Sequence, residues 1–193
     1  MTNQEVQYAK TALTGKISSL RNDFSRAYFN LNQYSIQTSP FPILMFTMSV
    51  VDFFSALLAG WSESSRNQNR FQTTRMIDFC VNQLGYGRIE STVLVKVHRH
   101  SLMHTSDPRI RSNQNGIYGW QIMNINPNHM HLSPQPNQNN IQVTLLDVGT
   151  GNLIDDLENF LTTSGGYFEL LDNDPEIQAN YMQCIQELDS QTI

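Results

Sequence analysis

Apolar residues recur at helical intervals along most of the chain. Between residues 4 and 32 they lie four or seven positions apart, with polar residues in the gaps: Val6, Leu13, Leu20, Phe24 and Leu31. This spacing gives one apolar stripe along one face, so it predicts a long amphipathic first helix. Pro40 and Pro42 end that helix, because proline lacks an amide donor and constrains the residue before it. A second, strongly apolar helix is predicted from there to about Gly60.

This second segment is the one stretch of the sequence whose length approaches that of a membrane span. It runs from Phe41 to Trp61, carries Asp52 near its centre and lacks the flanking Lys and Arg residues that are typical of a span. We therefore expect a buried helix of a bundle.

Two more helices are predicted before residue 107. The third carries apolar residues at helical spacing and ends at Gly85 and Gly87, which favour a helix C-terminus. The fourth is expected over residues 89 to about 104. Three β-branched valines between residues 93 and 97 suit a strand as well, so both structures remain open there.

The pattern changes after Asp107-Pro108. Residues 117–125, 130–132 and 141–148 alternate weakly between apolar and polar positions, and a segment rich in proline and asparagine precedes the last run. Short alternating runs divided by turn residues predict a small antiparallel β unit.

Two C-terminal helices are predicted after the β unit. One begins at the glycine-containing turn of residues 149–152, and the other begins at Asp174-Pro175-Glu176 and runs to about Leu188. The expected fold is therefore mainly α. It is a single domain over residues 1–193, made of a helical bundle core (4–106), an antiparallel β unit inserted after the fourth helix (107–148) and C-terminal helices (149–193).

The composition is that of a compact domain that needs no covalent or metal support. At 193 residues, with 39% apolar and 15% charged residues, the chain can bury a sizeable core on its own. Cys80 and Cys184 are far apart and lack CxxC spacing, so we expect reduced thiols and no cofactor. The N-terminus shows no basic region followed by an apolar one, so we expect a cytoplasmic protein without membrane attachment.

Charge is distributed unevenly along the chain, whose formal net charge is −5. Residues 1–65 are neutral overall, residues 66–111 carry +5 and residues 112–193 carry −10. The basic segment is explained either by an anionic partner or by packing against the acidic C-terminal third of the same chain.

The chemically richest stretch is Arg99-His100-Ser101-Leu102-Met103-His104. An imidazole can take or give a proton near neutral pH, and a guanidinium, which keeps its charge, can hold a phosphate. Arg99 and His104 would lie about 140° apart on a straight α-helix. They share a face where the helix ends nearby or the long arginine side chain curls round. Such a pair could cleave RNA without a metal, with His104 as base or acid for attack by a ribose 2′-hydroxyl and Arg99 stabilising the developing charge.

The stretch resembles the motif of HEPN domains, which are helical bundles with an arginine, several further residues and a histidine, usually with a polar residue directly after the arginine. Arg99, His100 and His104 match this pattern, and the resemblance covers about residues 4 to 104. It implies a metal-independent endoribonuclease or RNA-binding protein in a defence or toxin setting. It also implies a homodimer in which two motifs face one another, with an antitoxin or other protein partner. HEPN domains often keep an acidic residue on an earlier helix, and Asp52 is the candidate here, expected beside Arg99.

Some HEPN relatives are non-catalytic, so the alternative is a helical interaction module in which Arg99 and His104 are structural. In that case Lys96, His98, Arg99 and His100 form a solvated or acid-paired helix face, and His104 is a partly buried histidine. The sequence does not decide between these two functions.

Histidine spacing also permits a metal site. His100 and His104 are four positions apart on the predicted helix, and His129 and His131 are two apart as on a strand, so each pair shares a face. No HExxH glutamate is present, and nothing in the sequence brings the two pairs together, so we expect no metal.

Two other patterns are similar to ligand-binding sequences. Residues 145–151, Leu-Leu-Asp-Val-Gly-Thr-Gly, resemble the first motif of class I methyltransferases, where a strand ends in a glycine turn. The residues that follow are too few for the alternating strands and helices of that fold, so we interpret the segment as a strand-to-helix turn. Arg66, Arg70 and Arg75 flank Phe71, which suits a nucleic-acid surface but also an ordinary amphipathic helix with its arginines in water.

Overall fold

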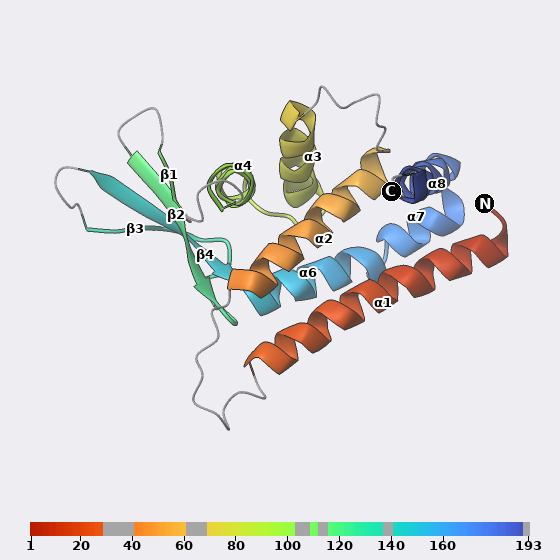
Figure 1. The fold of residues 1–193 in the computed structure, drawn as a ribbon, viewed down its shortest axis with the longest axis horizontal. Helices are drawn as coiled ribbons and strands as arrows, with labels where there is room; N and C mark the ends of the chain where they lie inside the picture. The colour runs from red at the N-terminus through yellow and green to blue at the C-terminus, as the bar shows by residue number, and fades with distance from the viewer. Residues whose placement is uncertain (29–40, 61–68, 103–108, 112–115, 137–140, 191–193) are drawn as a thin grey trace.

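The structure is a computed structural model that describes residues 1–28, 41–60, 69–102, 109–111, 116–136 and 141–190. Its helices are α1 (Asn3–Tyr28), α2 (Phe41–Ala59), α3 (Asn69–Asn82), α4 (Arg88–Lys96), the π-helix η3 (Val97–Leu102), α6 (Thr150–Thr162), α7 (Tyr167–Asn173) and α8 (Pro175–Ser190). Its strands are β1 (Arg109–Arg111), β2 (Gly116–Met123), β3 (Leu132–Pro134) and β4 (Gln142–Gly149). The prediction of a mainly helical bundle with a small β unit after the fourth helix is confirmed (Figure 1).

Helix α2 is the centre of the bundle. It packs against α1, α3, α6 and α8. Leu44, Met48, Phe54 and Leu57 of α2 are fully buried. Because apolar residues lie on nearly all sides of this helix, burial on several sides is the stable arrangement, as the sequence predicts.

Helix α1 lies along the C-terminal helices. Its buried residues form the predicted stripe: Val6, Ala9, Leu13, Ile17, Leu20 and Phe24. The N-terminal ammonium donates a hydrogen bond to Gln178 Oε1 at 2.9 Å, and Lys10 Nζ lies 2.6 Å from Asp172 Oδ1. The end of this helix predicted near residue 32, with Leu31, lies outside the described residues.

An aromatic cluster joins four helices of the core. The Phe160 ring of α6 lies with its centroid 5.7 Å from that of Phe54, 4.9 Å from that of Phe79 and 5.5 Å from that of Tyr167. These rings come from α2, α3 and α7. Phe160 is 5% exposed, so its loss would leave a cavity between all four helices.

The β unit is a four-stranded sheet in the order β1-β2-β4-β3. The pairs β1–β2 and β3–β4 are antiparallel, but the central pair β2–β4 is parallel, which corrects the expected pairing and makes the sheet mixed. The chain passes from β2 to β3 at the far edge, and β4 then fills the place between them. Strand β3 runs opposite to β2. Because β4 runs antiparallel to β3, it runs in the same direction as β2. Alternation of apolar residues marks a strand but not its direction.

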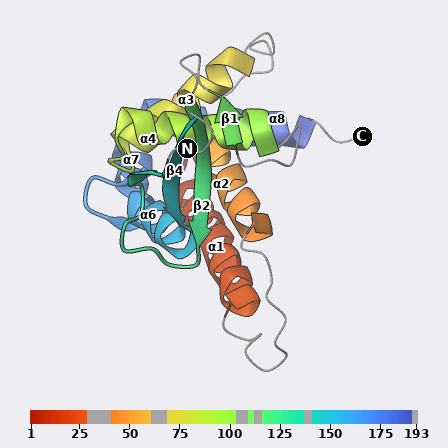
Figure 2. The same ribbon diagram turned by 90° about the vertical axis from the view of Figure 1, so that its left-hand side faces the viewer.

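The sheet buries one face against the helices. Trp120 of β2 and Leu146 of β4 are paired across the two strands, and their side chains are 6% and 0% exposed. Helix α4 contacts both strands, and α6 contacts β4. Figure 2 shows β2 and β4 in front of the helices, so the sheet closes one end of the bundle.

The sequence pattern missed two short elements, β1 and α7. β1 has three residues, too few for an alternation to be visible. α7 has seven residues and follows a turn in which Gly165 adopts a φ of +76°, a conformation that glycine allows.

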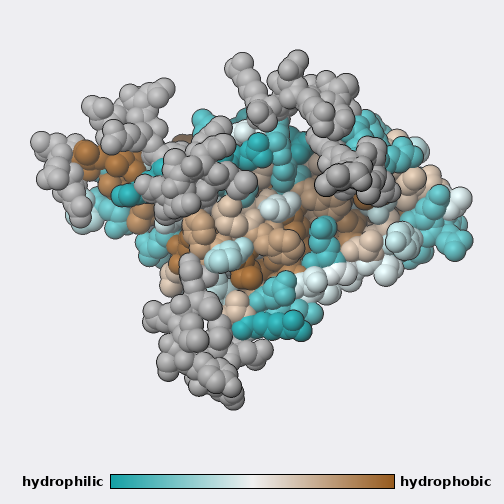
Figure 3. Space-filling model, viewed as in Figure 1, coloured by the Kyte–Doolittle hydropathy of each residue, from teal (hydrophilic) through white to brown (hydrophobic). Residues whose placement is uncertain are grey.

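Within the described part of the chain, α2 is the one helix that is long and apolar enough to cross a membrane. Half of its most apolar window is buried inside the protein. Some apolar surface is left, since Phe46 is 45% exposed and Figure 3 shows apolar side chains over the middle of one face. This burial is compatible with a soluble protein in which α2 is the core helix.

Replacement of the central aromatic ring should strongly destabilise the fold. We expect Phe160→Ala to lower the free energy of unfolding by about 3–5 kcal/mol, measured by urea denaturation followed by circular dichroism. The control is Tyr8→Ala on α1, where the side chain is 75% exposed. That variant should stay within about 0.5 kcal/mol of the wild type. Equal losses in both variants would contradict the described packing.

Candidate functional site

The Arg99 motif lies in an unusual turn of helix. Helix α4 continues directly into η3, a π-helix over Val97–Leu102. In a π-helix each backbone N–H bonds to the carbonyl five residues earlier, and such turns are rare and often found at functional sites. Residues 89–102 are therefore helical and not a strand, and the wide turn carries Arg99.

Arg99 is half-buried and makes no hydrogen bond or ion pair with another described residue. By contrast, Arg21, Arg75 and Arg88 each contact a carboxylate. A guanidinium carries five N–H donors and cannot lose its charge in a protein. These donors, which have no partner among the described residues, could hold an anionic ligand.

His98 is adjacent to Arg99 in the sequence, but its side chain is buried in the protein interior. Its side chain is 6% exposed, and its Nδ1 atom has no hydrogen-bond partner in the described part of the chain. Burial, and to a smaller extent the charge of Arg99, lower the pKa of His98 to about 4, while the charge of Asp52 opposes the shift. His98 is thus neutral at physiological pH. A signal for its burial exists in the sequence, because His98 follows buried Leu94 by four positions on the same helix face.

Asp52 pairs with Arg75, and no described contact joins it to Arg99. Arg75 Nη2 lies 2.7 Å from Asp52 Oδ1, and Gln72 Nε2 donates to Asp52 Oδ2. Arg75 Nε also donates to Ser55 Oγ at 3.0 Å. Helix α3 packs directly against α2, which places Arg75 within contact distance of the Asp52 carboxylate. Asp52 remains near the site, since its charge acts on His98.

Several predicted side chains lie outside the described part of the chain. His104 and Arg66 are not described, nor are the side chains of His100, Arg70 and Phe71. The structure therefore places Arg99 and Asp52 but not the proposed partner histidine.

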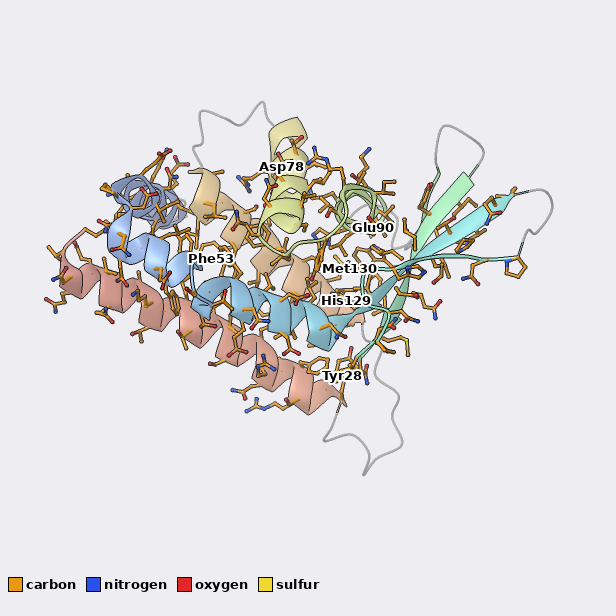
Figure 4. The ribbon with its side chains drawn as sticks, turned by 180° about the vertical axis from the view of Figure 1, so that it is seen from behind. Tyr28, Phe53, Asp78, Glu90, His129 and Met130 are labelled. Carbon is orange, nitrogen blue, oxygen red and sulfur yellow. The ribbon has the colours of Figure 1, made fainter. Side chains whose placement is uncertain are left out.

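A second polar cluster joins three parts of the fold. The Tyr86 hydroxyl donates to Asp156 Oδ2 at 2.5 Å and lies 3.1 Å from His129 Nε2. The Gly149 N–H donates to His129 Nδ1 at 3.0 Å, so the His129 proton sits on Nε2, toward Tyr86. Burial and the Asp156 carboxylate raise the pKa of Tyr86, which therefore stays protonated and acts as a donor. Figure 4 shows His129 and Met130 where the sheet meets the helices.

The turn from β4 into α6 is closed by neighbouring groups. The Gly151 N–H donates to the Asn124 carbonyl at 2.7 Å, and the Asn126 N–H donates to Asn152 Oδ1 at 2.9 Å. A Cβ atom on Gly149 would lie 2.8 Å from the Asn126 nitrogen, so only glycine fits. The prediction of a strand-to-helix turn is confirmed, and its Gly149 and Gly151 amides both donate hydrogen bonds within the protein.

Of the four histidines whose spacing permits a metal site, only the side chains of His129 and His131 are described. His129 belongs to the Tyr86 cluster, and His131 is exposed. Within the described ranges, no group of three or more His, Cys, Asp or Glu side chains could hold a metal ion.

Ion pairs bear on the uneven charge of the chain. Between described side chains, acids of the C-terminal third pair with α1, through Lys10–Asp172 and Arg21–Asp155. The basic segment forms the pairs Arg75–Asp52 and Arg88–Asp78. None of these four pairs joins the basic segment to the acidic C-terminal third.

The buried His98 should make stability depend on pH. Its pKa is about 4 in the folded chain against 6.5 for the ordinary group. Below pH 6.5 the unfolded chain binds a proton that the folded chain does not, so the free energy of unfolding falls as pH decreases toward 4. The loss amounts to about 3 kcal/mol and is absent above pH 6.5. Urea denaturation at several pH values should show that the free energy of unfolding falls less with decreasing pH in His98→Gln than in the wild type. An identical fall in both proteins would show that His98 does not cause this pH dependence.

The Tyr86 cluster should be structural. Tyr86→Phe removes the hydroxyl that contacts Asp156 and His129, and we expect a loss of about 1–3 kcal/mol in the free energy of unfolding. Tyr118→Phe is the matched control, because half-buried Tyr118 on β2 makes no described hydrogen bond. Urea denaturation that gives the same stability for both variants would show that the cluster contributes nothing.

The arrangement brings a cation that has no partner among the described residues and a buried neutral imidazole together in one wide helical turn. An anion could bind to Arg99 there, while His98 is held uncharged below it. Comparison of the chain with protein-family models, with curated proteins and with solved structures gives no match.

Proposed function

We propose that this protein is a HEPN-like, metal-independent endoribonuclease or RNA-binding protein whose site is built around Arg99. The observation that carries the proposal is the half-buried Arg99 guanidinium without a described partner. A phosphodiester supplies the negative charge that balances the Arg99 guanidinium, and its oxygens match the planar arrangement of the guanidinium N–H donors.

The π-helix supports the pairing of Arg99 with His104. On an α-helix, residues five positions apart diverge by about 140°. A π-turn instead bonds residue i to residue i+5, so residues at that separation come close to one face. Arg99 lies within η3, which ends at Leu102, and a continuation of this turn by two residues would bring His104, which lies outside the described residues, toward the face of Arg99.

The proposed reaction is an internal transfer at phosphorus. A ribose 2′-oxygen bonds to the adjacent phosphorus, and the bond from phosphorus to the 5′-oxygen of the next nucleotide breaks. His104 takes the proton of the 2′-hydroxyl or gives one to the leaving 5′-oxygen, and Arg99 stabilises the charge on the phosphoryl oxygens. The products are a 2′,3′-cyclic phosphate and a 5′-hydroxyl. His98, whose pKa is about 4, is not suited to this proton transfer at neutral pH.

The resemblance to HEPN domains extends the proposal to the assembly and its setting. A homodimer would bring two copies of the motif together, and Arg99 of each copy would then face a shared RNA. We place the protein in the cytoplasm, in a defence or toxin system with an antitoxin or other protein partner.

Cleavage of labelled RNA in the presence of a chelator tests the proposal. We expect Arg99→Ala and His104→Ala each to lower the cleavage rate by about 10²–10⁴-fold, because each removes a group that acts on the transition state. Arg26→Ala and His131→Ala are matched controls, since both side chains are exposed, and they should cleave like the wild type.

Two outcomes would change the proposed function. Cleavage at the wild-type rate in both Arg99→Ala and His104→Ala would remove the site. RNA binding that depends on Arg99, without cleavage by the wild type, would favour the non-catalytic module.

A further inference from the structure

We infer that the exposed side of α4 guides a single-stranded RNA to Arg99. This surface, the α4 track, carries Ile89, Thr92 and Lys96, and the inference rests on the function proposed above. It adds a second phosphate contact, Lys96, and an apolar contact for a base, Ile89.

The track ends at Lys96, directly before the turn that carries Arg99. Ile89 is 61% exposed, Lys96 is exposed and Thr92 is half-buried. The intervening Val93, Leu94 and Val95 are buried. Lys96 is the last residue of α4 and precedes Arg99 by three positions, so the two cations lie within one turn of the continuous helix.

The charge of the track is concentrated at its Arg99 end. Arg88, at the other end of α4, contacts Asp78 of α3, so its charge is compensated. Lys96 makes no ion pair with another described residue. A lysine near a helix C-terminus often stabilises free carbonyl groups. Here α4 continues into η3, so that explanation does not account for Lys96.

Ile89 indicates a single strand and not a duplex. A large apolar side chain that is 61% exposed gains from contact with an unstacked base or a ribose. In an A-form duplex the bases are stacked inside the helix, and protein contacts are mainly to phosphates and 2′-hydroxyl groups. A narrow surface with one lysine, one isoleucine and the Arg99 fork therefore suits a single strand whose bases are open.

The test is the affinity of wild type and variants for a fluorescent single-stranded RNA with 2′-O-methyl groups, which cannot be cut. Affinity is measured by fluorescence anisotropy at several salt concentrations. Lys96→Gln should weaken binding several-fold at low salt and reduce the slope of log affinity against log salt by about 0.7, the value for one lost phosphate contact on a single strand. Ile89→Ala should weaken binding with an unchanged slope, because an apolar contact releases no counterion.

Arg26→Gln is the matched control for the loss of one positive charge. Arg26 is exposed on the last turn of α1, and Figures 1 and 2 both show this end of α1 far from α4. Its binding and salt slope should equal those of the wild type. All three substituted residues are exposed, so the variants should fold, which urea denaturation verifies.

The outcomes separate this inference from the proposed function. If Arg99→Ala loses RNA cleavage but Lys96→Gln and Ile89→Ala bind like Arg26→Gln, the α4 track is refuted and the Arg99 site remains. If Arg99→Ala alters neither RNA binding nor cleavage, the proposed function fails and the track fails with it. If oligo-glutamate of equal charge displaces the RNA as well as unlabelled RNA does, the track binds an acidic protein and the RNA assignment is overturned.

Discussion

The enclosure of α2 is the constraint on which the other elements depend. This helix is apolar on nearly every side, so it is stable in water only when other helices surround it. Helices α1 and α3 flank it in sequence, but α6 and α8, which complete the enclosure, come from beyond the sheet. The one carboxylate near its centre, Asp52, is held by Arg75 and Gln72, which keeps a partly buried charge compensated.

The wide turn at η3 separates two side chains that are adjacent in sequence. His98 faces the protein interior, and its unpaired Nδ1 atom costs about 1–3 kcal/mol, a typical penalty for a buried polar group without a partner. Arg99 faces the boundary with solvent and keeps its charge. Burial and the neighbouring cation both favour the neutral imidazole, so the two side chains coexist without a buried charge. Local departures from regular helix with unpaired polar groups are found more often at binding sites than in ordinary cores.

Sequence periodicity predicted the helices well, because apolar spacing reports directly which face is buried. The stripe from Val6 to Phe24 and the strongly apolar α2 appear in the structure as expected. The features that sequence periodicity did not predict depend on contacts between distant segments. The parallel direction of β2 and β4 follows from the route of the chain through β3, which alternation does not encode. The partner of Asp52 is Arg75 because α3 lies across α2, and the π-turn at Arg99 leaves no sign in residue spacing.

Contacts between the N-terminal and C-terminal helices constrain the order in which this protein can fold during synthesis. The N-terminal ammonium bonds to Gln178, and Lys10 and Arg21 pair with acids on α7 and α6. During synthesis α1 therefore leaves the ribosome long before the helices that cover its apolar stripe exist. Because long-range contacts are formed late and folding slows as sequence separation grows, α1 and α2 have to wait with apolar surface exposed until residues beyond 150 emerge. A chain that stops before α6 would lack a cover for that surface, and aggregation, not partial folding, is its expected fate.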